Sequence, residues 1–179
     1  MAEPSEKEIK LRVEGASLAR AALERIGARL VVPREFEDNL LLDDERGVLG
    51  AAGVVLRVRR TPRGGRLTFK GPSRVVEGVK TREEIESEVQ DPSALLLVLE
   101  RLGFRRVFRY QKYRETYAWG GQEIVIDETP IGSFFEIEGD VPGIHRAAAA
   151  LGFQPSDFVT ESYASLFFAA GRSGDMVFA

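Results

Sequence analysis

The sequence predicts an α+β protein in which an antiparallel β-sheet is covered by helices. Several segments alternate between charged and apolar residues with the two-residue period of a half-buried strand. Glycine-rich turns such as Gly120-Gly121 separate some of these segments, and such turns are typical of hairpins between antiparallel strands. Other segments repeat apolar residues at helical spacing and end near a glycine.

The first predicted strand runs from Glu6 to Val13. Side chains on a strand alternate between its two faces, so the charged residues of this segment share one face and its apolar residues share the other. Two carboxylates and an ammonium group, at Glu6, Glu8 and Lys10, therefore form a row. Such a row suits a metal ion and an anion that are bound side by side.

The remaining elements follow from the same two patterns and from turn residues. The 17–26 helix is followed by Gly27, and the 92–103 helix has Pro92 near its start. Segments 43–53 and 71–81 contain turn residues and are predicted to be loops. Further strands are expected at 30–32, 36–42, 54–60, 67–70, 82–88, 107–119, 122–127 and 134–139, and helices at 17–26, 92–103, 142–151 and 157–169.

The length predicts one domain. A chain of 179 residues with 44% hydrophobic content can bury one sizeable core and is short for two. We expect a single domain over residues 1–170. The tail at 171–179 has little to fix it in place, so we expect it to fray.

Composition excludes several classes of function. The net charge is only −3 although 30% of residues are charged, which argues against a nucleic-acid partner. With no cysteine and one histidine, the chain lacks thiolate and two-histidine metal sites. It has no apolar run of about 18 residues and no segment resembling a signal peptide. We therefore expect no membrane partner and a cytoplasmic location.

The charged strand positions have two interpretations. They could be the solvated face of an ordinary antiparallel sheet. However, an ordinary solvated face avoids neighbouring like charges, whereas here they recur two residues apart, as at Glu136 and Glu138. The predicted strands place cations at Lys10, Arg57, Arg59, Lys70, Arg82, Lys112 and Arg114, and carboxylates at Glu6, Glu8, Glu84, Glu86, Asp127, Glu136 and Glu138.

If the sheet closes on itself, these charges line a polar channel. Arginine and lysine would bind a polyphosphate, arginine through its planar fork. Carboxylates without histidine or cysteine partners select a hard ion such as Mg²⁺ or Mn²⁺. A triphosphate with its divalent metal needs both sets of side chains at once.

Six motifs follow one another along the predicted strands: Glu6-x-Glu8-x-Lys10, Leu56 to Arg59, Leu67 to Pro72, Arg82-x-Glu84-x-Glu86, Lys112-x-Arg114 and Ile131 to Glu138. In this order they resemble the CYTH superfamily, the triphosphate tunnel metalloenzymes, especially their class IV adenylyl cyclase and thiamine triphosphatase branch. The resemblance implies a closed antiparallel barrel of about eight strands that encloses a tunnel, with helices outside.

The resemblance also implies roles for individual residues. Lys10 and Glu8 would be catalytic, with Lys10 between metal and phosphate. The triphosphate would bind to Arg57, Arg59, Lys70, Lys112 and Arg114, and by strand parity to Arg82. The metal ligands would be Glu6, Glu8, Glu136 and Glu138, with Glu84 and Asp127 as helpers.

The family contains cyclases and hydrolases, so several functions stay open at this point. The leading expectation is conversion of ATP to cyclic AMP and pyrophosphate, and a homodimer is consistent with that branch. The alternatives are hydrolysis of thiamine triphosphate or inorganic tripolyphosphate, and a non-catalytic polyphosphate or nucleotide sensor. A carrier of apolar ligands would require Leu56, Phe69 and Ile137 to face the lumen.

Overall fold

A computed structural model describes residues 5–179, so the first four residues of the expected domain lie outside it. The strands are β1 (Ser5–Val13), β2 (Arg29–Asp43), β3 (Val55–Thr61), β4 (Gly64–Lys70), β5 (Arg74–Val76), β6 (Val79–Val89), β7 (Arg105–Trp119), β8 (Gln122–Thr129) and β9 (Gly132–Glu138). The helices are α1 (Ala16–Arg25), α2 (Val48–Ala51), α3 (Pro92–Arg101), α4 (Val141–Ala150) and α5 (Tyr163–Ala169), with a 3₁₀ turn at Pro155–Asp157.

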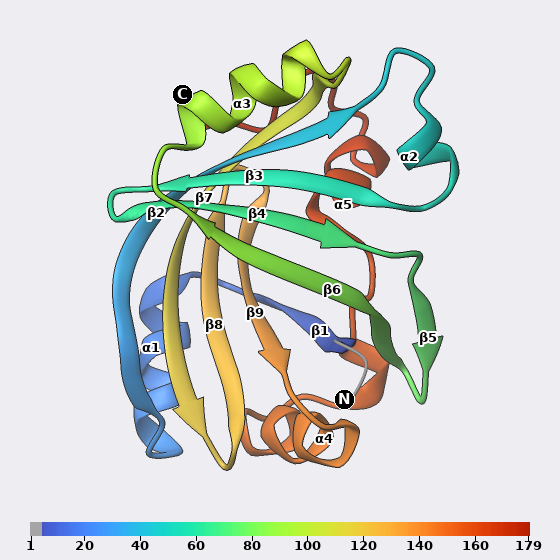
Figure 1. The fold of residues 1–179 in the computed structure, drawn as a ribbon. Helices are drawn as coiled ribbons and strands as arrows, with labels where there is room; N and C mark the ends of the chain where they lie inside the picture. The colour runs from blue at the N-terminus through green and yellow to red at the C-terminus, as the bar shows by residue number, and fades with distance from the viewer. Residues whose placement is uncertain (1–4) are drawn as a thin grey trace.

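Eight antiparallel strands form a closed barrel. They follow the order β1-β9-β8-β7-β2-β3-β4-β6, and pairing between β1 and β6 closes the ring. β5 is an additional strand that pairs with β6. Figure 1 shows α3 near β3 and β4, and α1 and α4 beside the opposite part of the wall. The predicted α+β barrel is therefore confirmed. No helix within residues 5–179 has the length and apolar character needed to cross a bilayer.

The main hydrophobic core lies between the barrel wall and the helices α1 and α4. Ile9 and Leu11 of β1 are fully buried there, against Leu23 of α1 and Ile144 of α4. Burying each such side chain contributes about 1.5–3 kcal/mol. This burial fixes the register of β1, because a one-residue slip would turn its charged face into the core.

The C-terminal tail has partners on the barrel, which differs from the expectation that little fixes it in place. Met176 accepts a hydrogen bond from the backbone N–H of Gln111 (2.9 Å) and donates one to the carbonyl of Arg109 (2.9 Å). β8 pairs with β7 only from Tyr113 onwards, so the earlier edge of β7 is free for the tail. The side chain of Met176 is also fully buried in a second core beneath α5. This burial stabilises the pairing of the tail with β7.

Two expected loops contain regular structure. α2 forms within 43–53 because the carboxylate of Asp43 accepts hydrogen bonds from the N–H groups of Leu49 (2.9 Å) and Gly50 (2.8 Å). β5 forms within 71–81 as one arm of a tight hairpin with β6. Glu77 and Gly78 make its turn, both with positive φ, as a two-residue hairpin turn requires.

Two further elements differ in extent from the prediction. β2 is one strand through Pro33, because its register with β7 shifts between Val32 and Glu35 and the proline needs no partner there. The expected helix at 157–169 begins only at Tyr163. Val159 before it is extended because it pairs with Lys10 of β1.

Candidate active site

A cavity of about 860 Å³ occupies the interior of the barrel. Strand alternation sends the charged residues of β1, β3, β6, β7 and β9 into it, and the start of α5 lines part of its wall. Within the described chain, these residues include every predicted site residue except Asp127: Glu6, Glu8, Lys10, Arg57, Arg59, Lys70, Arg82, Glu84, Lys112, Arg114, Glu136 and Glu138.

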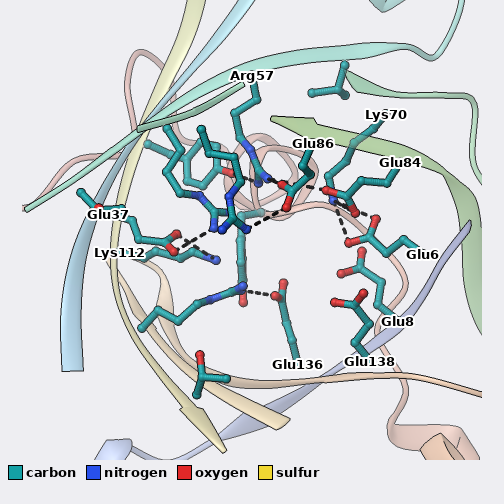
Figure 2. Close-up of a pocket in the computed structure, with 18 of the residues that line it drawn as sticks. Glu6, Glu8, Glu37, Arg57, Lys70, Glu84, Glu86, Lys112, Glu136 and Glu138 are labelled. Atoms are coloured by element: carbon teal, nitrogen blue, oxygen red, sulfur yellow. Dashed lines mark hydrogen bonds and ion pairs between the residues drawn. The ribbon is translucent and has the colours of Figure 1, made fainter. Parts of the chain in front are cut away.

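One side of the cavity is acidic. Figure 2 shows Glu6, Glu8, Glu84 and Glu138 gathered there, because β1 lies between β9 and β6 in the ring. Part of the Glu138 residue is exposed to solvent, but desolvation of its carboxyl group and then the neighbouring carboxylates, Glu6 first, raise its pKa to about 8. Burial also raises the pKa of Glu84 to about 7, although Lys70 opposes it. No lysine or arginine of residues 5–179 forms an ion pair with Glu138, so its carboxyl group has no cationic partner in the protein.

The other side of the cavity is cationic. Arg57 and Arg59 lie two residues apart on β3, and Lys112 and Arg114 do the same on β7. Burial and the adjacent Arg57 lower the pKa of Arg59 below its usual value, which reflects the positive field there. Among the described residues, Nε of Arg57 is a buried donor without an acceptor. A buried donor in a positive field is suited to an anion.

Each arginine on this side also has a protein partner. Arg57 donates to the hydroxyls of Tyr110 (3.2 Å) and Thr68 (3.1 Å). Arg59 pairs with Glu37 at 3.0 Å. These contacts fix where the guanidinium groups lie before any ligand binds.

Lys10 lies between the acidic and cationic sides. Its Nζ is 3.1 Å from Glu8 and 3.2 Å from Glu136, and the side chain is almost fully buried. Burial favours the neutral amine, but the two carboxylates raise the pKa of Lys10 above its usual value. Lys10 is therefore a cation at neutral pH and can stabilise negative charge.

Asp127 and Arg82 lie differently from the other predicted residues. Asp127 is fully buried and does not line the cavity; its carboxylate accepts hydrogen bonds from Lys112 (2.9 Å), Arg114 (2.7 Å) and Tyr163 (2.8 Å). It acts as the counter-ion of two cations, which does not support the expected role in metal binding. Arg82 reaches the cavity wall, but its guanidinium donates to the backbone carbonyl of Gly71 at 2.9 Å.

Several cavity residues were not predicted as site residues. Lys80 pairs with Glu8 at 2.8 Å, and Glu37 lies between Arg59 and Lys112. Lys80 lies two residues before Arg82 and therefore on the same face of β6. The predicted strand began at residue 82, and starting it two residues earlier would have identified Lys80. Tyr110 likewise precedes Lys112 by two, but an aromatic residue on a strand usually indicates packing.

The donor set on the acidic side fits a hard divalent cation. Glutamate oxygens are the ligands that Mg²⁺ and Mn²⁺ prefer, and the repulsion that raises the pKa of Glu138 would be relieved by a bound cation. Within residues 5–179, no three acidic or histidine side chains already converge on one point. The glutamates would therefore reorient to hold an ion.

The chain thus has the architecture of a closed antiparallel barrel in which cations face carboxylates across one interior cavity, and such a lining is suited to a charged ligand. The model of one family, the CYTH domain, matches residues 5–154. The chain belongs to the CYTH family.

The chain is similar to individual proteins in sequence and in structure. A Methanocaldococcus jannaschii protein provisionally named an adenylate cyclase is 27% identical over 142 residues, which is 79% of this chain and 80% of the relative. A Vibrio parahaemolyticus structure with the same provisional name has a TM-score of 0.80 at 18% identity and covers 93% and 99% of the two chains. A Hippeastrum adenylyl cyclase homologue has a TM-score of 0.66 at 22% identity over 94% and 97%, and is described as having a dominant triphosphatase activity.

Proposed function

We propose that this protein is a divalent-metal-dependent enzyme that acts on a triphosphate bound inside the barrel. The observation that carries the proposal is the division of one cavity into a cationic side and an acidic side, with Lys10 between them. An apolar ligand is not suited to this lining. Leu56, Phe69 and Ile137 are absent from the described cavity wall, and Ile137 is buried against the helices outside.

The cations would hold the phosphate groups. Phosphate oxygens would replace the carboxylates that now neutralise Lys70 and Arg57, and the free Nε of Arg57 would gain an acceptor. Asp127 stays behind Lys112 and Arg114 and keeps them aimed into the cavity. The triphosphate ligands are then Arg57, Arg59, Lys70, Lys112 and Arg114.

The carboxylates Glu6, Glu8, Glu84, Glu136 and Glu138 would hold Mg²⁺ or Mn²⁺. A bound divalent ion supplies neutralisation of phosphate charge and activation of the attacking oxygen. Glu8 and Glu136 keep Lys10 protonated and fixed. From that position the ammonium group stabilises charge that develops at the reacting phosphorus, while the arginines hold the chain of phosphates in line.

Two reactions are compatible with this arrangement. In a cyclase the ribose 3′-hydroxyl of ATP attacks the α-phosphorus and releases pyrophosphate; the provisional name of the M. jannaschii relative supports this reaction. In a hydrolase, water attacks the terminal phosphorus and releases orthophosphate; the activity described for the Hippeastrum homologue supports this one.

One feature of the lining supports hydrolysis as a second candidate reaction beside cyclisation. The only aromatic residues among the described lining residues are Tyr110 and Tyr163. Both contact cations, Tyr110 through its hydroxyl and Tyr163 through its ring. The cavity therefore holds many phosphate ligands but offers no free aromatic ring on which adenine could stack.

Product analysis tests the proposal. The purified protein is incubated with ATP, thiamine triphosphate and tripolyphosphate in turn, each with Mg²⁺ and with Mn²⁺. Cyclic AMP with pyrophosphate identifies a cyclase, and orthophosphate identifies a hydrolase. Lys10→Ala is purified in parallel. If the activity arises in the barrel cavity, this variant must lose it. Tight binding without product would indicate a sensor, and neither binding nor product would contradict the proposal.

A further inference from the structure

Tyr163 belongs to the cavity although it lies beyond the segment that matches the CYTH domain, which ends at residue 154. It is the first residue of α5 and is only 6% exposed. Its hydroxyl donates a hydrogen bond of 2.8 Å to Asp127, which is fully buried. Removing a hydrogen-bond donor from a buried carboxylate costs free energy.

The ring of Tyr163 contacts two ammonium groups from different strands. Nζ of Lys10 on β1 lies 5.3 Å from the ring centroid, and Nζ of Lys112 on β7 lies 5.4 Å from it. Both lysines are at most 3% exposed. A buried ammonium group at this distance is attracted by an aromatic face, so one ring stabilises two like charges.

The hydroxyl of Tyr163 acts on the cationic side through Asp127. That carboxylate accepts from Nζ of Lys112 at 2.9 Å and from Nε of Arg114 at 2.7 Å. The Tyr163 hydroxyl is the third donor to this carboxylate and helps to fix its orientation. The carboxylate in turn fixes the positions of Lys112 and Arg114. The ring therefore acts directly on Lys10 and Lys112, and the hydroxyl acts through Asp127 on Lys112 and Arg114.

Neighbouring residues prevent the Tyr163 ring from moving. Ser162 caps α5 by accepting a hydrogen bond from the N–H of Ser165 (3.0 Å). Phe134 packs edge-on against the Tyr163 ring with centroids 5.2 Å apart. Met176 from the C-terminal tail fills the same core. These contacts hold the ring in place, as a positioning role requires.

We propose that Tyr163 is a positioning residue of the active site: its ring places Lys10 for the reaction, and its hydroxyl, through Asp127, places Lys112 and Arg114 for phosphate binding. The kinetic part of this inference rests on the proposed function. The positioning itself concerns only residues of this chain and can be measured without a substrate.

Kinetics of Tyr163→Phe and Tyr163→Leu separate the two parts of the side chain. Phe keeps the ring and loses the hydroxyl, so it raises KM for the triphosphate about tenfold while kcat stays within about twofold. Leu loses both and also lowers kcat about tenfold, because Lys10 keeps its ion pairs with Glu8 and Glu136 but loses the aromatic face that orients it. Tyr117→Phe is the matched control, since the hydroxyl of buried Tyr117 donates to Glu115 (2.9 Å) outside the cavity. It leaves KM and kcat unchanged.

The ammonium NMR signals of Lys10 and Lys112 provide the readout that needs no turnover. Both signals lie in the field of the Tyr163 ring, so both shift in Tyr163→Leu. In Tyr163→Phe the Lys10 signal stays near its position, whereas the Lys112 signal shifts because Asp127 has lost the hydroxyl that holds it. Both signals stay near their positions in Tyr117→Phe. If the shifts occur but the wild type processes no triphosphate, the proposed function fails and the positioning stands. Unchanged lysine signals in Tyr163→Leu, or kinetics of both Tyr163 variants equal to those of Tyr117→Phe, would overturn the inference.

Discussion

Nζ of Lys70 lies 2.7 Å from Oε1 of Glu6, so a proposed triphosphate ligand and a proposed metal ligand neutralise each other in the free protein. Lys70 is also 3.1 Å from Glu84. An anion that binds Lys70 must displace these carboxylates, and a cation that binds the carboxylates releases Lys70. Each ligand therefore removes part of the cost of binding the other.

We expect metal and triphosphate binding to be positively coupled. Calorimetry with a non-hydrolysable triphosphate analogue, corrected for metal binding in solution, should give an affinity about tenfold or more higher with Mg²⁺ than without it. The affinity for Mg²⁺ must rise by the same factor when the analogue is present. In Lys70→Ala the coupling should fall, because Glu6 and Glu84 no longer have to release that cation. Equal affinities with and without metal would contradict this account.

Lys10→Ala should lower kcat about 10²- to 10³-fold. The fold should tolerate the change at a cost of about 1–2 kcal/mol, because Lys80 still neutralises Glu8 and Arg114 still neutralises Glu136. Lys7→Ala is the control, since Lys7 is on the same strand but does not line the cavity. Steady-state kinetics and urea unfolding of both variants check the prediction. Wild-type turnover in Lys10→Ala would remove Lys10 from the mechanism.

Arg57→Ala should act mainly on binding and raise KM about a hundredfold, with a smaller loss of kcat. Arg57→Lys should fall between this variant and the wild type, because lysine keeps the charge but loses the planar fork. Arg34→Ala tests for a non-specific effect of removing a positive charge. That guanidinium lies 3.5 Å from the ring of Tyr113 and does not line the cavity. An equal rise of KM in Arg34→Ala would mean that Arg57 has no special role.

Strand alternation predicted most of the cavity lining because a closed barrel preserves it on every strand. On β6, for example, Arg82, Glu84 and Glu86 share a face, and all three line the cavity. The same rule failed for Asp127, which has the parity of Glu123 on β8 but is not part of the wall. The carboxylate of Asp127 instead accepts hydrogen bonds from the cations of β7 and from Tyr163, which lies 36 positions later in the chain. A strand pattern contains no information about a side chain that arrives from a distant helix.

The tail was mispredicted for a related reason. Its sequence has no strand or helix pattern. Its position is set by backbone groups of β7 that do not pair with β8. Because β7 extends from Arg105 while β8 joins it only at Tyr113, an unpaired edge remains. An unpaired edge offers backbone partners to any nearby chain. Only the relative lengths and register of two strands show that this edge exists.

Glu115→Gln should destabilise the protein at neutral pH by about 2 kcal/mol. Hydrogen bonds from Arg20 (2.9 Å) and Tyr117 (2.9 Å) lower the pKa of Glu115, although burial opposes this. A lowered pKa in the folded state stabilises the fold above the unfolded value of about 4.3, and this stability is lost as pH falls through the folded value. Urea unfolding from pH 6 to pH 3 should show the difference between wild type and variant shrinking. Glu24→Gln, on the exposed face of α1, is the control and should show no such trend. If the difference in unfolding free energy between Glu115→Gln and wild type stays constant with pH, the stabilisation does not come from the charge of Glu115.

Met176→Ala should cost about 2–4 kcal/mol, because it opens a cavity between Phe108 and Phe167 in the core beneath α5. Val177→Ala is the matched control, since Val177 is the next residue and is 36% exposed. Urea unfolding of the two variants compares them directly. Tyr163 belongs to the same core, so Met176→Ala should also raise KM for the triphosphate at concentrations where the protein remains folded. Equal stability of the two variants would mean that the tail lies on β7 without supporting it, and α5 would then be held by its own cap and by its contacts with Phe134 and Phe108.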